Sequence, residues 1–466
     1  MRGFSVGVCT MVLGVGVLGD AARAQGWSNA GGNAGRNGSF ATLGPDAADL
    51  AWQGGRSSII AWQPVIDGSR VFLVRQTGFP PETTASPVVA MDLETGRELW
   101  AANIPANSGD WTTWVMGARD GRVYASRSGN GSSVSARFFC LNASNGATIW
   151  QSVQTIDAGA YDGVVFAENG DLIVGGFRTV RRVRAADGGT VWTADRLCSV
   201  SGNCGGAVHG GAVYIADAVP GGHAIKKFDL ATGAFRYQSP TMAGFTIQNS
   251  PMVGPDGTVY LNRVQNNAAV DFFYAFEDTG SALVERWRVE SRWTTGSEFA
   301  ATQDGVYVPF RDNSIRLLRA QDGVQIASTG VLAQPLSSPR MAVDASGRLY
   351  MSNGEFAQGR FFAFNADLSL RWSVGVTNVN IGAPAFGPEG TLVVAGVGTN
   401  VRAYRTDRCQ ADFDGDGFVD FFDLSAFAEC FEGGTCPPGK NADFDGDGFV
   451  DFFDFQAYAS AFEAGC

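Results

Sequence analysis

Histidine is almost missing from this chain: His209 and His223 are the only two among 466 residues. Each stands beside a pair of glycines, which is typical of a turn, with a proton-shuttle role as the alternative. The motifs of zinc proteases, c-type haem attachment, serine hydrolases and phosphate-binding loops are missing as well. The enzyme classes that these motifs mark are therefore excluded, whereas paired carboxylates would still allow glycoside cleavage.

An excess of basic residues is also missing. The net charge is −12, and the stretch from Cys409 to Cys466 accounts for all of it, with thirteen acidic residues and one basic residue, Lys440. The rest of the chain holds thirty-three acidic and thirty-three basic residues. Without a basic footprint the chain is not expected to bind nucleic acid. The acidic stretch is rich in phenylalanine, which argues against a disordered tail.

Long apolar runs are missing beyond the first residues. Arg2, the apolar stretch from Phe4 to Leu18 and the Ala22-Arg23-Ala24 site predict a signal peptide over residues 1–24, with a mature chain from Gln25. A membrane anchor is the alternative, but the run is short for a span, and no other segment is long enough. We therefore expect a secreted bacterial protein, extracellular or attached to a cell surface, in which residues 25–46 form a lead-in segment.

Adjacent cysteines are missing too, and removal of the leader takes Cys9 with it. In an oxidising compartment six of the remaining seven are expected to form three disulfides. Cys198 and Cys204 would close a small loop. The four cysteines of the tail allow three pairings, of which we favour Cys409–Cys466 and Cys430–Cys436. Cys140 is expected as a buried thiol in a strand.

What the chain does contain is a repeat. Its clearest copy is AMDLETGRELW, from Ala90 to Trp100, and related stretches follow along the chain. Each copy is preceded by a turn that ends in glycine, most often Asp-Gly, and a short strand, and eight such turns occur about 41 to 53 residues apart. That period fits four short strands per unit. It predicts an all-β, eight-bladed propeller over residues 47–407.

The two ends of the repeat region predict how the ring closes. The last unit lacks its outer strand, and the stretch Leu50–Gln53 resembles an outer strand with no blade before it. Aromatic residues recur at one place in successive units, where a flat ring wedges neighbouring blades together. We assign these residues a structural role only: Trp52, Trp100, Trp150, Trp192, Trp287 and Trp372, with Tyr237 and Ala327 as substitutes.

The repeat resembles the tryptophan-docking motif of the propellers of quinoprotein dehydrogenases. Ala90, Asp92, Thr95, Gly96 and Trp100 match that motif position by position, and the resemblance covers nearly the whole body. It implies an eight-bladed fold, but that fold carries dehydrogenases as well as assembly scaffolds. A quinone site of that family has adjacent cysteines, which this chain lacks.

Five aromatic residues outside the docking positions are expected near the mouth of the central channel. Rings at such a rim can stack on a carbohydrate or another small ligand. The alternative is that they plug the channel or cover strand ends. They are Trp62, Trp111, Trp114, Tyr161 and Trp293.

The stretch ADFDGDGFVDFFD occurs twice in the tail, from Ala411 and from Ala442. Its carboxylates fall at positions 1, 3, 5, 9 and 12 of a loop with glycine at position 6, and position 7 can offer a backbone carbonyl. This is the calcium-loop pattern of an EF-hand, so two calcium ions are expected. The expected ligands are Asp412, Asp414, Asp416, Phe418, Asp420 and Asp423, and Asp443, Asp445, Asp447, Phe449, Asp451 and Asp454.

One short helix is expected after each loop, so each unit is half an EF-hand. In the first helix, the spacing of Phe421, Leu424, Ala428 and Phe431 predicts one apolar face. Position 12 of each loop is Asp rather than the usual Glu.

Duplicated units of one loop and one helix resemble dockerin domains, and the cysteine-bearing form ends in Gly-Cys, as residues 409–466 do. The resemblance implies a small helical domain that folds with calcium and docks to a cohesin-like or cell-surface protein. In dockerins the positions at the start of the helices select the partner. Here they are Phe421-Phe422 and Phe452-Phe453, and the alternative is that these rings belong to the core.

Three functions are consistent with these features. We prefer a secreted, non-catalytic binding or scaffold protein that a calcium-dependent dockerin-like module attaches to a surface or assembly. The first alternative is an extracellular polysaccharide-degrading enzyme, a glycoside hydrolase or lyase of a cellulosome-like system. The second is a dehydrogenase dependent on pyrroloquinoline quinone. The sequence favours a protein that is not an enzyme and assigns no catalytic residue.

Overall fold

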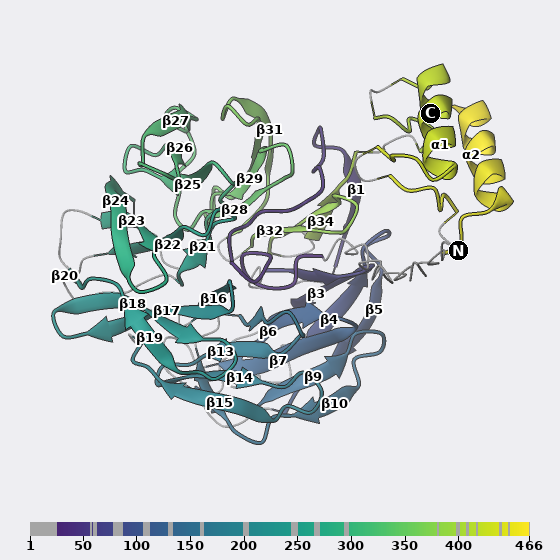
Figure 1. Ribbon diagram of the computed structural model, residues 1–466. Coiled ribbons are helices and arrows are strands. Elements are labelled where there is room, and N and C mark those ends of the chain that lie inside the picture. The colour runs from purple at the N-terminus through teal and green to yellow at the C-terminus, as the bar shows by residue number, and fades with distance from the viewer. Residues whose placement is uncertain are drawn as a thin grey trace, which may run out of the picture.

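The architecture comes from a computed structural model of the chain. It describes residues 26–55, 58, 63–77, 87–105, 112–128, 134–158, 163–198, 205–243, 250–264, 271–292, 298–379, 382–397, 401–406, 410–415, 418–437, 440–445 and 448–465. Small antiparallel sheets stand around a common axis, and two helices lie side by side outside the ring (Figure 1). Eight of these sheets are blades, so the predicted eight-bladed propeller is confirmed. The predicted signal peptide lies outside the described residues.

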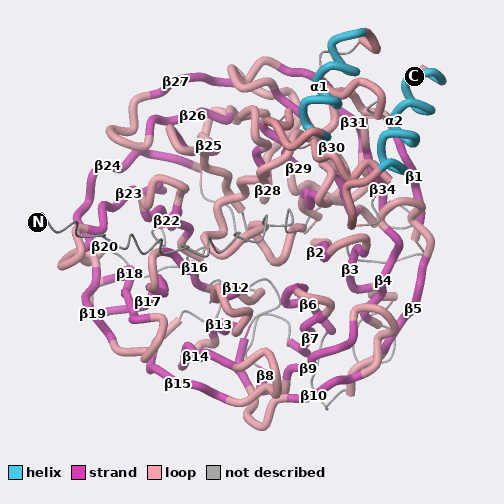
Figure 2. Tube along the Cα trace, turned by 45° about the vertical axis from the view of Figure 1, so that its right-hand side comes forward, coloured by secondary structure: helices cyan, strands magenta, loops and turns pink. Residues whose placement is uncertain are grey.

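Each blade runs from an inner strand near the axis to an outer strand at the rim (Figure 2). The first four blades are β2 (Val65–Asp67), β3 (Arg70–Val74), β4 (Val88–Asp92) and β5 (Glu98–Ala102); β6 (Thr112–Arg119), β7 (Arg122–Ser128), β9 (Phe138–Asn142) and β10 (Thr148–Gln151); β12 (Val165–Phe166), β13 (Leu172–Gly175), β14 (Thr179–Val183) and β15 (Thr190–Asp195); and β16 (Gly206–His209), β17 (Ala212–Val219), β18 (Gly222–Asp229) and β19 (Phe235–Gln238).

The last four blades follow the same order around the ring. They are β21 (Met252–Val253), β22 (Val259–Val264), β23 (Asp271–Asp278) and β24 (Leu283–Ser291); β25 (Gly305–Pro309), β26 (Ile315–Arg319) and β27 (Gln325–Ser328); β28 (Arg340–Val343), β29 (Leu349–Ser352), β30 (Arg360–Phe364) and β31 (Leu370–Gly375); and β32 (Pro384–Phe386), β33 (Leu392–Ala395), β34 (Val401–Tyr404) and β1 (Leu50–Gly54). Outside this pattern, β8 (Val134–Ala136) pairs with β11 (Ile156–Ala158), and β20 (Met242–Ala243) pairs with β18.

The burial of each strand follows its place in the blade. The inner strand of blade seven, β28, is buried along its whole length, whereas the outer strand β24 buries Leu283, Trp287 and Ser291 and leaves the residues between them exposed or only partly buried. Side chains alternate between the two faces of a strand, so only a strand with both faces covered can be apolar throughout. The core therefore lies in the layers between neighbouring blades.

Blade six departs from the four-strand expectation. Its named strands are β25, β26 and β27, and an isolated bridge between Ala301 and Val306 takes the place of the inner strand.

The ring closes as the sequence predicts. Strand β1 pairs antiparallel with β34, with Leu50 opposite Tyr404, and so completes the eighth blade with a strand from the start of the chain. A ring of blades closed in this way leaves no strand unpaired between the two ends of the repeat.

The repeated tryptophans form one type of contact between blades. In five of the six, the indole nitrogen donates a hydrogen bond to a main-chain oxygen of the next blade, at 2.7 to 3.0 Å. The pairs are Trp52 with Leu93, Trp100 with Ala143, Trp150 with Ala185, Trp192 with Leu230, and Trp287 with Ala320. Each ring lies against the glycine of that blade's turn, where a β-carbon at Gly96, for example, would come within 2.4 Å of Trp52. The structural role assigned to these rings is confirmed.

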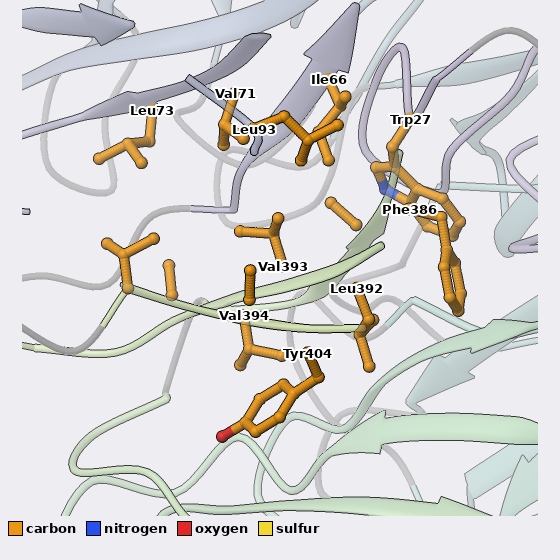
Figure 3. Close-up of a cluster of buried hydrophobic side chains, with 14 of the residues drawn as sticks. Trp27, Ile66, Val71, Leu73, Leu93, Phe386, Leu392, Val393, Val394 and Tyr404 are labelled. Atoms are coloured by element: carbon orange, nitrogen blue, oxygen red, sulfur yellow. The ribbon is translucent and has the colours of Figure 1, made fainter. Parts of the chain in front are cut away.

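The segment between Gly26 and Pro45, called the hub segment below, lies on the axis inside the ring (Figure 1). Trp27 is fully buried there and belongs to a core cluster with Ile66 of blade one and Phe386 of blade eight (Figure 3). The segment that the sequence presents as a lead-in is therefore packed within the propeller.

Both described helices belong to the C-terminal part of the chain, α1 (Phe421–Phe431) and α2 (Phe452–Ala464). In the part of the chain that the structure describes, no helix has the length and apolar character needed to cross a lipid bilayer.

Candidate metal centre in the C-terminal module

The C-terminal module, residues 410–465, contains two similar units in which an Asp-rich loop leads into a helix. Asp420 caps the N-terminus of α1 by accepting the N–H of Phe422 at 2.7 Å. Asp451 caps α2 in the same way through Phe453 at 2.8 Å. A carboxylate is favoured at this place because it satisfies free N–H groups and faces the positive end of the helix dipole.

Three carboxylates of each loop converge. The sets are Asp412, Asp414 and Asp423, and Asp443, Asp445 and Asp454, and each set has oxygens within 4.8 Å of one another. Positions 1, 3 and 12 of the predicted loops therefore meet in space. Asp416 and Asp447, at position 5, lie outside the described residues. Asp420 and Asp451, at position 9, are not part of these clusters and serve as helix caps.

One buried carboxylate holds each loop against its helix. Asp423 accepts the N–H of Asp414 and the N–H of Asp420, both at 2.9 Å. Asp454 accepts the equivalent N–H groups of Asp445 at 3.1 Å and Asp451 at 2.8 Å. Burial alone would raise the pKa of Asp423, but these backbone donors outweigh it and leave that pKa lowered. The pKa of Asp454 is also lowered, chiefly by the N–H of Asp451.

The donor set fits a hard cation. All converging groups are carboxylate oxygens, which are the ligands of Mg²⁺ and Ca²⁺, and no histidine or thiolate is among them. In the described part of the module, Oδ1 of Asp443 is buried without a hydrogen-bond partner. Asp443 also lines a cavity of about 850 Å³ between the module and the ring, together with Lys440 and Arg405. Such a buried oxygen is costly unless a cation neutralises it.

The two units pack on each other with near two-fold symmetry. Phe427 of α1 and Tyr458 of α2 stack with ring centroids 4.0 Å apart. Phe413 and Phe444, which occupy the same position in the two loops, meet this pair edge-on from either side. The symmetry of the core thus reproduces the duplication of the sequence.

The disulfide framework of the module is partly described. Cys430 and Cys436 form the favoured disulfide, with Cα atoms 4.5 Å apart. Cys409 and Cys466 lie outside the described residues, as does Cys204 in the ring.

Cys198 is buried against Phe177. Cys140 is a buried thiol in β9, as predicted, and burial raises its pKa to about 12.

The phenylalanines at position 7 of each loop and at the start of each helix are exposed. Between 63% and 72% of the surface of each of six side chains is accessible: Phe418, Phe421, Phe422, Phe449, Phe452 and Phe453. The alternative that Phe421-Phe422 and Phe452-Phe453 belong to the core is therefore wrong, because Phe427 and Tyr458 fill that core instead. The six rings, three at equivalent positions in each of the two units, are called the Phe patches below.

The predicted apolar face of α1 is wrong by one position. The helix buries Asp423, Phe427 and Cys430, while Leu424 and Phe431 are only partly buried and Phe421 is exposed. The face turns because the carboxylate at position 12 must reach back into its own loop.

Most of the aromatic residues proposed for the channel mouth cannot be placed. Trp62, Trp111, Tyr161 and Trp293 lie outside the described residues. Trp114 is only 3% exposed and packs among Tyr124, Phe166 and neighbours in a core cluster between blades. Its assignment as a ligand contact is wrong, because it lies within the inner strand β6 and its ring is buried in the core between blades.

Sequence reasoning missed a polar cluster that joins blades one, six and seven across the axis. Nε2 of Gln63 donates to Glu298 at 2.6 Å, and Arg340 donates to Gln63 at 3.0 Å and also pairs with Glu298. The three residues are far apart in the chain, and no spacing rule connects them. Only the closed ring brings them together.

The described residues on the axis do not fit a quinone cofactor. The hub segment fills the space among the inner strands, and Gln63, Glu298 and Arg340 use their polar groups on one another. No step is therefore assigned to a quinone in this chain.

Comparison with known proteins identifies the family to which the propeller belongs. The family model described as "Outer membrane protein assembly factor BamB" matches residues 84–308 and 176–373, which together span more than half of the chain. No curated protein matches the sequence. The chain is similar to the crystal structure of quinohemoprotein alcohol dehydrogenase from Comamonas testosteroni, with 12% identity, a TM-score of 0.55, and coverage of 83% of this chain and 82% of that one.

Two further structures share the fold. The computationally designed Ika8 protein is 12% identical over 77% of this chain and 100% of its own, with a TM-score of 0.52. The C-terminal WD40 domain of Sif2 is 11% identical over 78% of this chain and 98% of its own, with a TM-score of 0.51. At such identities only the fold is shared.

Proposed function

Because the chain belongs to the family described as outer membrane protein assembly factor BamB, a family of propellers, we propose that it is a non-catalytic binding or scaffold protein. In this proposal the protein is exported, and its C-terminal module is a dockerin-like domain that binds two calcium ions and docks to a cohesin-like or cell-surface partner. The propeller then presents its own ligand, such as a carbohydrate, from the attached position.

The observation that carries this proposal is the pairing of a carboxylate cluster with a Phe patch in each unit of the module. Asp423 closes the first loop at the start of the helix that carries Phe421 and Phe422. A cation in the cluster would neutralise the repulsion among its carboxylates and fix the loop. The adjoining rings would then be held in one arrangement, which is what a docking surface requires.

Calcium is favoured over magnesium. The loops supply up to six oxygen ligands from a flexible backbone, whereas magnesium demands near-octahedral geometry and keeps several waters. The test is calorimetry with the full chain, which should take up two calcium ions. Asp414→Asn and Asp445→Asn should each remove one of them. Glu429→Gln, which changes an exposed acidic residue outside the clusters, should leave both. No uptake by the unmodified chain would reject the calcium assignment.

Docking is tested with the same protein. In calcium, a cohesin-like module should bind the full chain, and a variant with Phe421, Phe422, Phe452 and Phe453 changed to Ala should lose that binding. Phe235→Ala provides the control, because this ring is 54% exposed on the outer strand β19 of the propeller. If the Phe-patch variant still binds with unchanged affinity, the rings are not the docking surface.

Export is proposed from the sequence of the first residues alone. Mass spectrometry of the protein recovered outside the cells should find Gln25 as the first residue.

The proposal that the protein is not an enzyme is tested by incubating the exported protein with a panel of polysaccharides. New reducing ends or unsaturated products would support the alternative of a polysaccharide-degrading enzyme.

A further inference from the structure

The hub segment makes a full circuit inside the ring and meets the blades in chain order. Its main-chain oxygens accept an N–H from six of the eight blades, at 2.8 Å each: Trp27 from Ile66, Ser28 from Ala118, Ala34 from Val208, Gly35 from Val253, Asn37 from Ala301, and Gly38 from Val343. Among the described residues, the remaining two blades donate no such bond but accept one, Phe386 from the N–H of Trp27 and Val164 from the side chain of Asn29.

These bonds satisfy groups that the ring itself leaves open. The inner strand of a blade has a neighbour on its outer side only, so its other edge presents free N–H and C=O groups to the axis. A backbone group buried without a partner is costly, and nearly all such groups in folded proteins are paired. The hub segment therefore does for the eight inner edges what a further strand would do.

Side chains of the hub segment add specific contacts. Nε of Arg36 donates to the oxygen of Gly206 at 2.6 Å, and Nη2 donates to that of Gly163 at 2.9 Å. Nδ2 of Asn37 donates to the oxygen of Val253 at 2.8 Å. These donors reach main-chain oxygens of three different blades, and both residues are buried.

The inner edges also limit which residues fit. A β-carbon at Gly35 would come within 2.7 Å of the main-chain oxygen of Val253, which cannot move away without breaking blade five. The exposed Ala41, near the end of the segment, has no comparable restriction. Phe40 completes the fit by stacking on Phe386 at 5.1 Å.

From these contacts we propose that the axis of the propeller is a binding site for a peptide rich in glycine and asparagine that folds into turns. The chain's own residues 26–45 occupy the site, and non-covalent contacts, rather than the connection to β1, hold them there. The connection is accessible: Ala47 is exposed, and cutting beside it leaves β1 paired with β34. This inference is independent of the proposed function.

The experiment uses the mature chain with the recognition sequence of a specific protease inserted between Ala47 and Ala48. After cleavage, the fragment that carries the hub segment should elute with the ring in gel filtration and separate from it only in denaturant. The same chain with Gly35→Ala should release the fragment, and Ala41→Ser should retain it. Elution of the unmodified fragment on its own would overturn the proposal.

A second measurement adds the segment from outside. A chain that starts at Ala48 should bind a labelled synthetic peptide of residues 26–45 with one-to-one saturation in fluorescence anisotropy. The Gly35→Ala peptide should bind at least about tenfold more weakly, because its added methyl group would press against the main chain of blade five. The free energy lost by overpacking of this kind corresponds to about a tenfold change in affinity. Equal binding of the two peptides would contradict the proposed site. If the shortened chain does not fold, the cleaved chain decides the question.

Discussion

The indole nitrogen of Trp52 donates to the main-chain oxygen of Leu93 at 2.7 Å, which joins the strand that closes the ring to the first blade. The same bond recurs at four other boundaries between blades. Trp372 lies at an equivalent place, but its indole nitrogen is buried without a hydrogen-bond partner in the described chain, and its ring packs on Tyr404. In the eighth blade the outer strand is β1, so no turn leads from β34 to the strand beside it.

This difference predicts unequal effects of the same substitution. Trp52→Phe should lower the free energy of unfolding by about 1–3 kcal/mol, since it leaves the oxygen of Leu93 without its donor. Trp372→Phe should cost less, because it removes an N–H that is already unsatisfied. Guanidinium unfolding of the two variants checks the order. Equal losses would show that the ring area, and not the hydrogen bond, carries the contact.

Two glycines separate backbone strain from ring packing. Gly96 and Gly280 both have positive φ, 68° and 83°, at the turn after the third strand of a blade. A β-carbon at Gly96 would meet the ring of Trp52, whereas nothing lies within 4 Å of one at Gly280. Gly280→Ala should cost about 1–2 kcal/mol for the left-handed conformation. Gly96→Ala should cost about 1–3 kcal/mol more. Urea unfolding measures the difference, and equal costs would mean that the docked ring can shift freely.

The boundary between blades four and five predicts a pH dependence. Here Tyr237 replaces tryptophan, and Asp278 of the next blade accepts its hydroxyl and that of Tyr214 and pairs with Lys227 at 2.7 Å. Burial alone would raise the pKa of Asp278, but these donors outweigh it and lower that pKa from 3.8 to about 2. The carboxylate therefore stabilises the fold above the ordinary pKa, and that stability is lost as the pH falls from about 4 to about 2.

Asp278→Asn should accordingly lower the free energy of unfolding by about 1–3 kcal/mol near neutral pH, as expected for losing hydrogen bonds to a charged group. Its deficit relative to the unmodified chain should shrink below about pH 4. Asp322→Asn, which removes only the exposed pair with Arg319, is the control and should change little. A deficit that stays constant down to pH 2 would show that the charge of Asp278 does not matter.

Removal of calcium should loosen the C-terminal module and leave the ring intact. Without a cation the carboxylates of each cluster repel one another, so the N–H groups of Asp414 and Asp445 should lose protection. Hydrogen exchange measured by mass spectrometry, with and without chelator, gives the readout. Faster exchange is expected in both loops and no change in the inner strands of the blades. Unchanged loops would mean that the buried carboxylates hold them without metal.

The architecture of the ring could be predicted because its signals are local and repeated. Each glycine-containing turn and each docking tryptophan lies within one blade, and eight similar units leave few alternatives. The closing pair of β1 and β34 followed from counting which strand each end lacked. The aspartate clusters could be predicted as well, because all the ligand positions of a calcium loop lie within twelve residues of the sequence.

The contacts that depend on distant partners could not be predicted. The hub segment, rich in Gly and Asn, has no apolar alternation, so its sequence resembles a linker, and its partners come from all eight blades. The exposure of Phe421 and Phe422 depends on Phe427 and Tyr458 filling the core of the module first. Trp114 resembles a rim aromatic in the sequence, but it is covered by the neighbouring blade.

The residues from Gly26 to Gly54 supply both the hub segment on the axis of the propeller and the outer strand of its eighth blade. Leu50 can pair with Tyr404 only after the ribosome has synthesised Tyr404. The hub segment can form all of its hydrogen bonds only when every blade has folded. Contacts between residues so far apart in sequence are slow to form. During synthesis the earliest residues must therefore wait, unpaired and open to proteases or chaperones, until almost the whole ring has emerged.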